Sequence, residues 1–124
     1  REWEPNDEFL APRGTSAGGG YSTVEDLLAF DRALRGATLL SPETVATLID
    51  GKVDVGAPGL RYAYGFEDDR SGAERVVGHG GGAPGISAKL DMYWDLDTTV
   101  VSLSNYDQAA RFVAMKARRL IVGA

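Results

Sequence analysis

The chain has 124 residues, 44% hydrophobic and 25% charged, a composition that suits one globular domain with a hydrophobic core. Its net charge of −5 excludes a general nucleic-acid binder, because no basic surface would neutralise phosphates. The absence of cysteine excludes disulfides and, with a single histidine, argues against a zinc site, so we expect no metal and no cofactor. No apolar run is long enough for a membrane span and no signal peptide is recognisable. The sequence therefore does not indicate the cellular compartment of the protein.

The residue pattern changes along the chain and predicts four regions. Residues 1–20 are irregular, because prolines and a run of three glycines preclude a stable helix. Residues 21–51 show helical spacing, residues 61–105 show strand patterns, and residues 107–122 show helical spacing again. This order predicts an α+β fold over residues 1–124, in which helices flank an antiparallel sheet.

Capping signals predict where the first two helices begin and end. Ser22 and Glu25 fit a capping box, and Gly36 fits the position after the last turn, which together predict a helix at residues 23–35. The second helix begins at Ser41-Pro42, where serine is a good N-cap and the missing N–H of proline costs nothing.

The second half of the chain contains short apolar or aromatic runs that predict strands. The last two runs are separated by the turn-like residues 94–97 and therefore predict an antiparallel hairpin. An amphipathic helix at residues 109–122 then closes the fold. The four predicted strands are Tyr62–Glu67, Glu74–His79, Ser87–Tyr93 and Thr98–Ser104.

The segment with the most chemical information is Gly78–Gly85, which has five glycines in eight residues. Glycines let backbone N–H groups approach another molecule closely, and aligned N–H groups can bind an anion or a developing oxyanion. The simplest alternative is a loop whose glycines only permit tight turns. A phosphate-binding loop is disfavoured, because Pro84-Gly85 and a strand pattern follow where a helix should begin.

Two segments also match the motifs of α/β-hydrolase esterases literally. His79–Gly82 matches their oxyanion motif, and Gly14–Gly18 matches their nucleophile elbow around Ser16. However, no strand pattern precedes this elbow, and the two motifs occur in the reverse order. The one histidine would also have to act both as a motif residue and as the catalytic base. We therefore interpret the match as chance.

A different family matches over most of the chain, in segments that occur in the right order. In this order the segments resemble the β-lactamase-related serine hydrolases, a family that includes class C β-lactamases, penicillin-binding proteins, D-alanyl peptidases and esterases. The resemblance runs from about Pro12 to the C-terminus and is specific for the family, not for one activity. The matching segments are Ser16–Leu28, Leu39–Glu43, Tyr64–Phe66, Gly78–Gly85 and Leu103–Tyr106.

The resemblance implies roles for four consecutive residues. The third active-site motif of the family is Lys-Thr-Gly, with His in place of Lys in some peptidases and esterases, and here the substrate-binding residues His79, Gly80 and Gly81 occupy it. The next residue, Gly82, would donate its backbone N–H to the oxyanion and is the catalytic residue of this segment. Gly80 lacks the usual hydroxyl, and a mostly neutral histidine attracts a substrate carboxylate less than lysine does. The alternative for His79 is a purely structural hydrogen bond to a neighbouring loop.

The nucleophile and base of the family are absent from the sequence. No serine is followed by lysine three residues later, and no tyrosine is followed by asparagine two residues later. In the family both motifs lie N-terminal, so we expect a C-terminal segment of a partial β-lactamase/transpeptidase-like fold, without its N-terminal strands and nucleophile helix. The start at Arg1 instead of Met agrees with this expectation. The expected parent acts by acyl transfer on β-lactams, D-alanyl peptides or esters, and this chain alone is expected to be inactive. The alternative is a non-catalytic binding or degenerate module.

The same resemblance predicts the partners of the segment. The missing N-terminal strands of the parent domain would pair with residues 98–104, which otherwise form an open edge. This run is β-branched and apolar, with no proline or lysine to blunt the edge. We expect a small-molecule or peptide substrate, no nucleic acid and no membrane span. In isolation we expect a homodimer through residues 98–104, or a larger assembly through this run or the last helix. The competing outcome is that residues 1–12 fold over the edge.

Overall fold

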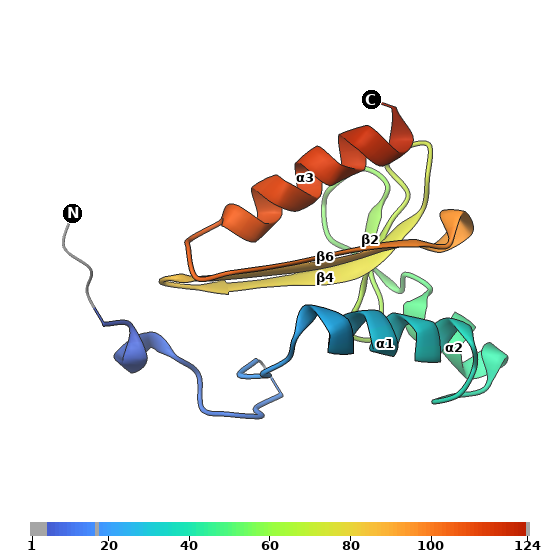
Figure 1. The fold of residues 1–124 in the computed structure, drawn as a ribbon. Helices are drawn as coiled ribbons and strands as arrows, with labels where there is room; N and C mark the ends of the chain where they lie inside the picture. Colours follow the sequence, from blue (N-terminus) through green and yellow to red (C-terminus); the bar gives the residue numbers. More distant parts are fainter. Residues whose placement is uncertain (1–4, 17, 124) are drawn as a thin grey trace.

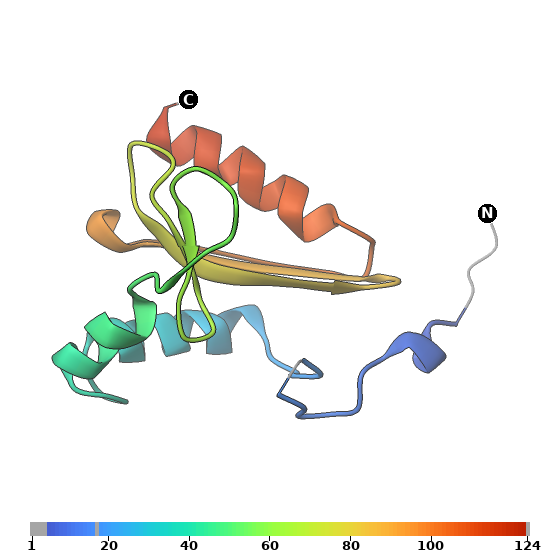
Figure 2. The same ribbon diagram turned by 180° about the vertical axis from the view of Figure 1, so that it is seen from behind.

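The computed structural model describes residues 5–16 and 18–123 and shows an α+β fold built on one antiparallel sheet of six strands. Helix α3 lies on one face of the sheet, and helices α1 and α2 lie on the other face (Figures 1 and 2). The predicted fold class is therefore confirmed. The elements are η1 Asp7–Phe9, α1 Val24–Arg35, α2 Pro42–Ile49, β1 Val53–Asp54, β2 Leu60–Tyr62, β3 Glu67–Asp69, β4 Val76–Ala83, β5 Ile86–Tyr93, η2 Trp94–Leu96, β6 Thr98–Ser104 and α3 Ala109–Val122.

The strands follow one another across the sheet in chain order, so that each inner strand pairs with the strand before it and the strand after it. The longest ladder joins β4 to β5 with Val76 opposite Tyr93, and β5 continues to β6 with Tyr93 opposite Thr98. This confirms the hairpin expected around residues 94–97. Within the described part of the chain, β1 and β6 form the two outer edges of the sheet.

The helices lie where the capping signals placed them, with one shift at each end of α1. Its N-cap is Thr23, whose hydroxyl accepts from the N–H of Asp26 at 3.1 Å, so the predicted capping box of Ser22 and Glu25 is wrong by one residue. At the other end, Gly36 is not the left-handed residue, because Ala37 takes that conformation with φ 53°. For α2, the predicted N-cap is confirmed: Ser41 accepts from the N–H of Thr44.

One predicted strand is wrong. Residues Tyr62–Glu67 do not form a single strand but the turn of the β2–β3 hairpin, in which the N–H of Ala63 donates to the carbonyl of Phe66 at 2.7 Å. Gly65 takes φ 79° there, a conformation that suits glycine and reverses the chain. Aromatic residues on both sides of the turn produced the misleading alternation.

The hydrophobic core lies between the sheet and the two N-terminal helices. Val77 of β4 and Met92 of β5 are both fully buried and pack with Leu34, Val45 and Ile49 of the helices. Burial of such side chains stabilises the fold by about 1.5–3 kcal/mol each. The opposite face is covered by α3, whose Ala110 and Ala114 are buried.

Polar contacts attach α1 to the end of the β5–β6 hairpin. The side chain of Arg35 donates to Asp31 at 2.8 Å and to the carbonyl of Trp94 at 2.8 Å, and its guanidinium lies over the Trp94 ring. The hydroxyl of Thr99 donates to the buried carboxylate of Asp31. These bonds fix the helix against the same strands that carry the core.

The N-terminal region and the outer surface of α3 are less tightly packed. Residues 5–16 and 18–20 contain only η1 and an isolated bridge between Thr15 and Gly18, while the expectation for residues 1–4 and 17 lies outside the described residues. The outer face of α3 exposes Phe112, Val113 and Leu120. None of the helices in the described part of the chain has the length and hydropathy that crossing a membrane requires.

Candidate functional site on strand β4

Strand β4 consists of two parts with different neighbours. Residues 76–78, here called the paired half, pair with both β3 and β5. Residues 79–83, called the glycine half below, pair with β5 alone among the described strands, because the first residue of β3, Glu67, lies opposite Gly78. The interpretation of the glycines as a loop is therefore wrong: they continue the strand and have one bare edge.

The register determines which backbone groups face this bare edge. The N–H of Trp94 donates to the carbonyl of Arg75 at 3.3 Å, which extends the β4–β5 ladder by one residue and shows that the odd-numbered residues of β4 bond to β5. Because hydrogen-bonding directions alternate along an antiparallel strand, the N–H and C=O groups of Gly80 and Gly82 point away from β5. Both residues therefore offer backbone donors at the bare edge.

The tip of the β4–β5 hairpin is held from two sides. Pro84 and Gly85 form its two-residue turn, with Gly85 at φ 72°. The carboxylate of Asp107 accepts from the N–H of Gly85, and the side-chain amide of Asn6 donates to the carbonyl of Pro84 at 2.8 Å. These contacts were not predicted, since they join segments 22 and 78 residues apart along the chain.

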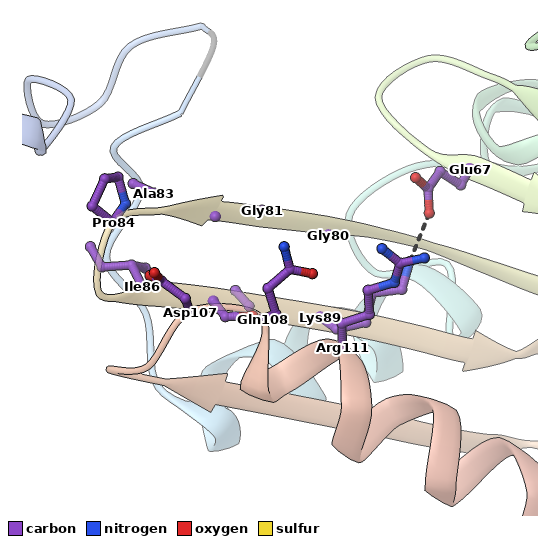
Figure 3. A pocket seen from close by; sticks show the side chains of 13 residues that line it. Glu67, Gly80, Gly81, Ala83, Pro84, Ile86, Lys89, Asp107, Gln108 and Arg111 are labelled. Atoms are coloured by element: carbon purple, nitrogen blue, oxygen red, sulfur yellow. Dashed lines mark hydrogen bonds and ion pairs between the residues drawn. The ribbon is translucent and has the colours of Figure 1, made fainter.

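A pocket of 820 Å³ lies between the glycine half and the first turn of α3 (Figure 3). Gly80, Gly81 and Gly82 line it together with Gln108, the N-cap of α3, and Arg111 in its first turn. Figure 3 shows the side chains of Gln108 and Arg111 extending from this end of the helix over the strands toward β4. The remaining lining residues are Glu67, Ala83, Pro84, Ile86, Ser87, Ala88, Lys89 and Asp107.

Charged groups at the inner end of the pocket neutralise one another. The ammonium of Lys89 lies 2.7 Å from the carboxylate of Glu67 and 3.4 Å from that of Asp91. Burial lowers the pKa of Lys89, but the hydrogen bond to Glu67 and the charge of Asp91 more than compensate, so its pKa is raised. Burial also raises the pKa of Asp91, and the neighbouring Lys89 only partly offsets this effect. Lys89 therefore stays charged as part of an ion-paired cluster.

His79 does not line this pocket. It lies two residues after the core residue Val77 on the same strand, so its side chain emerges on the face of α1 and α2, opposite to α3. There the side chain is exposed, and its Nε2 lies 2.9 Å from the phenol oxygen of Tyr62. The structure thus brings Gly80, Gly81 and Gly82 together at one edge and places His79 beside them on the other face.

The segment Gly14–Gly18 does not have the geometry of a nucleophile elbow. Its hydrogen bonds close a small turn, with the N–H of Gly14 donating to the carbonyl of Gly19 at 2.9 Å. Ser16 is exposed in this turn, and no strand leads into it within the described residues. A phosphate-binding loop is excluded as well, because β5 and not a helix follows Gly85.

Histidine, aspartate and glutamate side chains do not converge on a possible metal site. Across residues 5–16 and 18–123, no group of three or more such side chains is arranged to hold an ion. The acidic residues nearest to the pocket are instead bonded to Lys89 or to backbone N–H groups. The groups that this site offers are the backbone donors of the glycine half and the side chains of Lys89, Gln108 and Arg111, with the imidazole of His79 on the other face of the strand.

Comparison with known proteins identifies the family. No curated protein matches the chain. The family model described as Beta-lactamase matches residues 1–124, the whole length of the sequence. This match agrees with the six-stranded antiparallel sheet flanked by helices. The chain belongs to the Beta-lactamase family.

Proposed function

We propose that the chain is the C-terminal part of a serine hydrolase that acts by acyl transfer. The observation that carries this proposal is the bare edge of the glycine half, where no strand of the described residues pairs with the N–H of Gly82. A backbone N–H fixed in a strand needs no reorganisation when negative charge develops on a carbonyl oxygen. Membership of the Beta-lactamase family supports the assignment of this edge to acyl transfer.

In the proposed reaction, a serine hydroxyl attacks the substrate carbonyl and a base accepts the hydroxyl proton. The carbonyl oxygen becomes an oxyanion that is stabilised by the N–H of Gly82 and by the N–H of the serine. The leaving group departs with a proton from the base, and water then hydrolyses the acyl-enzyme. His79, Gly80 and Gly81 bind the substrate, which is a β-lactam, a D-alanyl peptide or an ester.

The serine and base of this proposal come from a segment that the sequence does not contain. No Ser-x-x-Lys and no Tyr-x-Asn occurs in the 124 residues. We infer that these motifs belong to an N-terminal part of the parent domain, whose strands pair with β6. The chain alone should therefore hydrolyse neither a chromogenic cephalosporin nor a p-nitrophenyl ester. Turnover that survives purification and is abolished by Ser16→Ala would contradict the proposal and support the esterase elbow.

The decisive experiment concerns Gly82 in a protein that joins this chain to a Ser-x-x-Lys segment. Gly82→Pro removes the proposed donor and should lower kcat about 10²–10³-fold. The matched control is Gly82→Ala, which keeps the N–H and places its Cβ 3.3 Å from the carbonyl oxygen of Ile86. Equal kinetics for both variants, with the fold intact by circular dichroism, would refute the role of Gly82.

The second candidate is a non-catalytic binding module of the same family. The missing nucleophile favours it, since a module that only binds ligands needs no Ser-x-x-Lys. The two candidates differ in one observation, the sequence that precedes Arg1 in its gene. A Ser-x-x-Lys followed by a Tyr-x-Asn-type motif there supports the hydrolase, and their absence supports the binding module.

A further inference from the structure

The hydrogen bond between Tyr62 and His79 joins two strands that are not neighbours. Tyr62 is the last residue of β2, and His79 is the first residue of the glycine half of β4. The phenol oxygen lies 2.9 Å from Nε2, and the two rings meet edge to face with centroids 5.7 Å apart. The contact is possible because the intervening strand β3 begins at Glu67, opposite Gly78, and has no residue paired with His79.

The position of Tyr62 is fixed by its backbone. Its strand partners are Val53 on one side and Glu67 on the other, and its carbonyl accepts from the N–H of Lys52 at 2.8 Å. The turn that follows is anchored by Ala63 and Phe66, both buried. A residue held in this way can orient the imidazole that it contacts.

The chemistry of the two groups determines the direction of the hydrogen bond. An imidazole nitrogen with a free lone pair is a far stronger base than a phenol oxygen, and a phenol O–H is a better donor than a neutral imidazole N–H. The favoured arrangement therefore has the O–H of Tyr62 donating to Nε2, which leaves the ring proton of His79 on Nδ1. Nδ1 has no hydrogen-bond partner among the described residues, so its N–H remains available to a ligand.

We propose that Tyr62 is a positioning residue that holds His79 as the neutral Nδ1–H tautomer, so that the site accepts an uncharged acyl group. A neutral N–H donor pairs with a carbonyl or ether oxygen and lacks the full charge that attracts a carboxylate. The substrate class is then an ester or amide without a carboxylate beside the scissile bond. This inference rests on the proposed function only for the identity of the substrate, because the tautomer is a property of the chain itself.

The tautomer can be measured directly, since the sequence contains a single histidine. In the ¹⁵N-labelled chain at a pH where the imidazole is neutral, Nδ1 should give the protonated and Nε2 the unprotonated chemical shift. Tyr62→Phe should return the ring to the Nε2–H form that free imidazoles favour. The control is Tyr64→Phe, which removes the phenol hydroxyl of another tyrosine of the same hairpin. Tyr64 is not bonded to His79, so this variant should leave the chemical shifts of the imidazole unchanged. An Nε2–H tautomer in the unmodified chain, or no response to Tyr62→Phe, would overturn the proposal.

A second measurement tests the substrate class in a protein that carries the nucleophile segment. Tyr62→Phe should lower kcat/KM for a neutral ester about fivefold, the contribution of one ordinary hydrogen bond. The change in kcat/KM should be smaller for a matched ester that carries a free carboxylate. An equal loss on both substrates would contradict the specificity. Absence of turnover in that protein with an intact Ser-x-x-Lys would reject the proposed function, while the tautomer result would still stand.

Discussion

The two halves of strand β4 have the same backbone conformation but serve different purposes. The paired half is buried, bonded to strands on both sides, and carries Val77 into the core. The glycine half is largely exposed and bonded on one side only. The difference arises from the extent of the neighbour: beyond the residues that pair with β3, no other described strand covers the donors of Gly80 and Gly82. In the proposed function, the strand thus forms structure along one stretch and a binding edge along the next.

Glycines occur in both halves for different physical reasons. A Cβ on Gly78 would overlap the carbonyl oxygen of Leu90 in β5, so the backbone itself excludes any side chain there. A Cβ on Gly81 would meet nothing within 4 Å. The first glycine is required by packing, and the second leaves room above the strand. The comparison predicts opposite outcomes for the same substitution.

The largest expected effect is that of Gly78→Ala. The strands β4 and β5 would have to separate locally, which should lower the free energy of unfolding by about 3 kcal/mol. Gly81→Ala should change it by less than about 1 kcal/mol, with a gain possible because alanine restricts the unfolded chain. Urea denaturation of both variants measures the difference. If Gly78→Ala and Gly81→Ala had similar free energies of unfolding, the two halves of β4 would be equivalent in packing.

The next effect tests the support of the paired half by β3. Asp68, opposite Val77, is buried and accepts from Arg75 at 2.7 Å, Arg70 at 3.0 Å and the N–H of Gly51 at 3.0 Å. Asp68→Asn leaves Arg75 without a charged partner among the described residues, while Arg70 keeps Asp50 at 3.3 Å. The substitution should cost about 2–3 kcal/mol, less than a fully buried pair because Arg70 is exposed.

The same carboxylate predicts a pH dependence. Burial raises the pKa of Asp68, but the hydrogen bonds from Arg75 and Arg70 outweigh it, so the pKa in the folded state is lowered. Its stabilising contribution is therefore fully present above about pH 4, the ordinary aspartate range, and is lost as the pH falls through the folded-state pKa. Urea midpoints measured across this range should fall less steeply in Asp68→Asn than in the unmodified chain. Asp95→Asn, at an exposed position, is the control. If the urea midpoints of Asp68→Asn and Asp95→Asn fell equally steeply with falling pH, the assignment to Asp68 would be contradicted.

A smaller effect of opposite sign is expected at Asp91, which faces Gly78 from β5. Burial raises its pKa in the folded state, so its contribution favours folding at low pH and is lost as the pH rises through that pKa. Asp91→Asn keeps the group neutral, while Lys89 retains Glu67 at 2.7 Å. The variant should gain stability relative to the unmodified chain as the pH rises from acid to neutral. A relative loss over this range would show that the charge of Asp91 is needed by Lys89.

Local signals in the sequence predicted some of these features and missed others. Ser41-Pro42 and the spacing of apolar residues defined the helices, because caps and periodicity are properties of neighbouring residues. The β2–β3 turn was missed, since only the tertiary fold distinguishes an aromatic turn from an aromatic strand. The bond between Tyr62 and His79 was also missed, because it depends on where β3 ends and not on any motif. The residues of the proposed site were selected through a family resemblance, and their roles remain predictions.

The smallest expected effect on stability concerns β6, the other bare edge of the sheet. Continuing the alternation from β5, the backbone groups of Val100 and Ser102 bond to β5, and those of Val101 and Leu103 point outward. No strand covers them within residues 5–16 and 18–123, and the described N-terminal residues contact the β4–β5 turn through Asn6 instead. Unlike the glycine half, this edge carries several apolar side chains. Because β6 has no charged residue, pairing with the β6 strand of a second copy brings no like charges together.

We therefore predict weak self-association of the chain through β6. Light scattering should show a mass that increases with concentration, and the amide of Val101 should exchange faster than that of Val100 in dilute solution and become protected as the chain associates. Leu103→Lys adds a charge at this edge and should keep the chain monomeric, without a change beyond about 0.5 kcal/mol in the free energy of unfolding at low concentration. The matched control is Phe112→Lys on the exposed face of α3, which should leave association unchanged if the strand and not the helix forms the contact. A chain that stays monomeric at high concentration, with Val101 as protected as Val100, would show that residues 1–12 or another segment covers the edge.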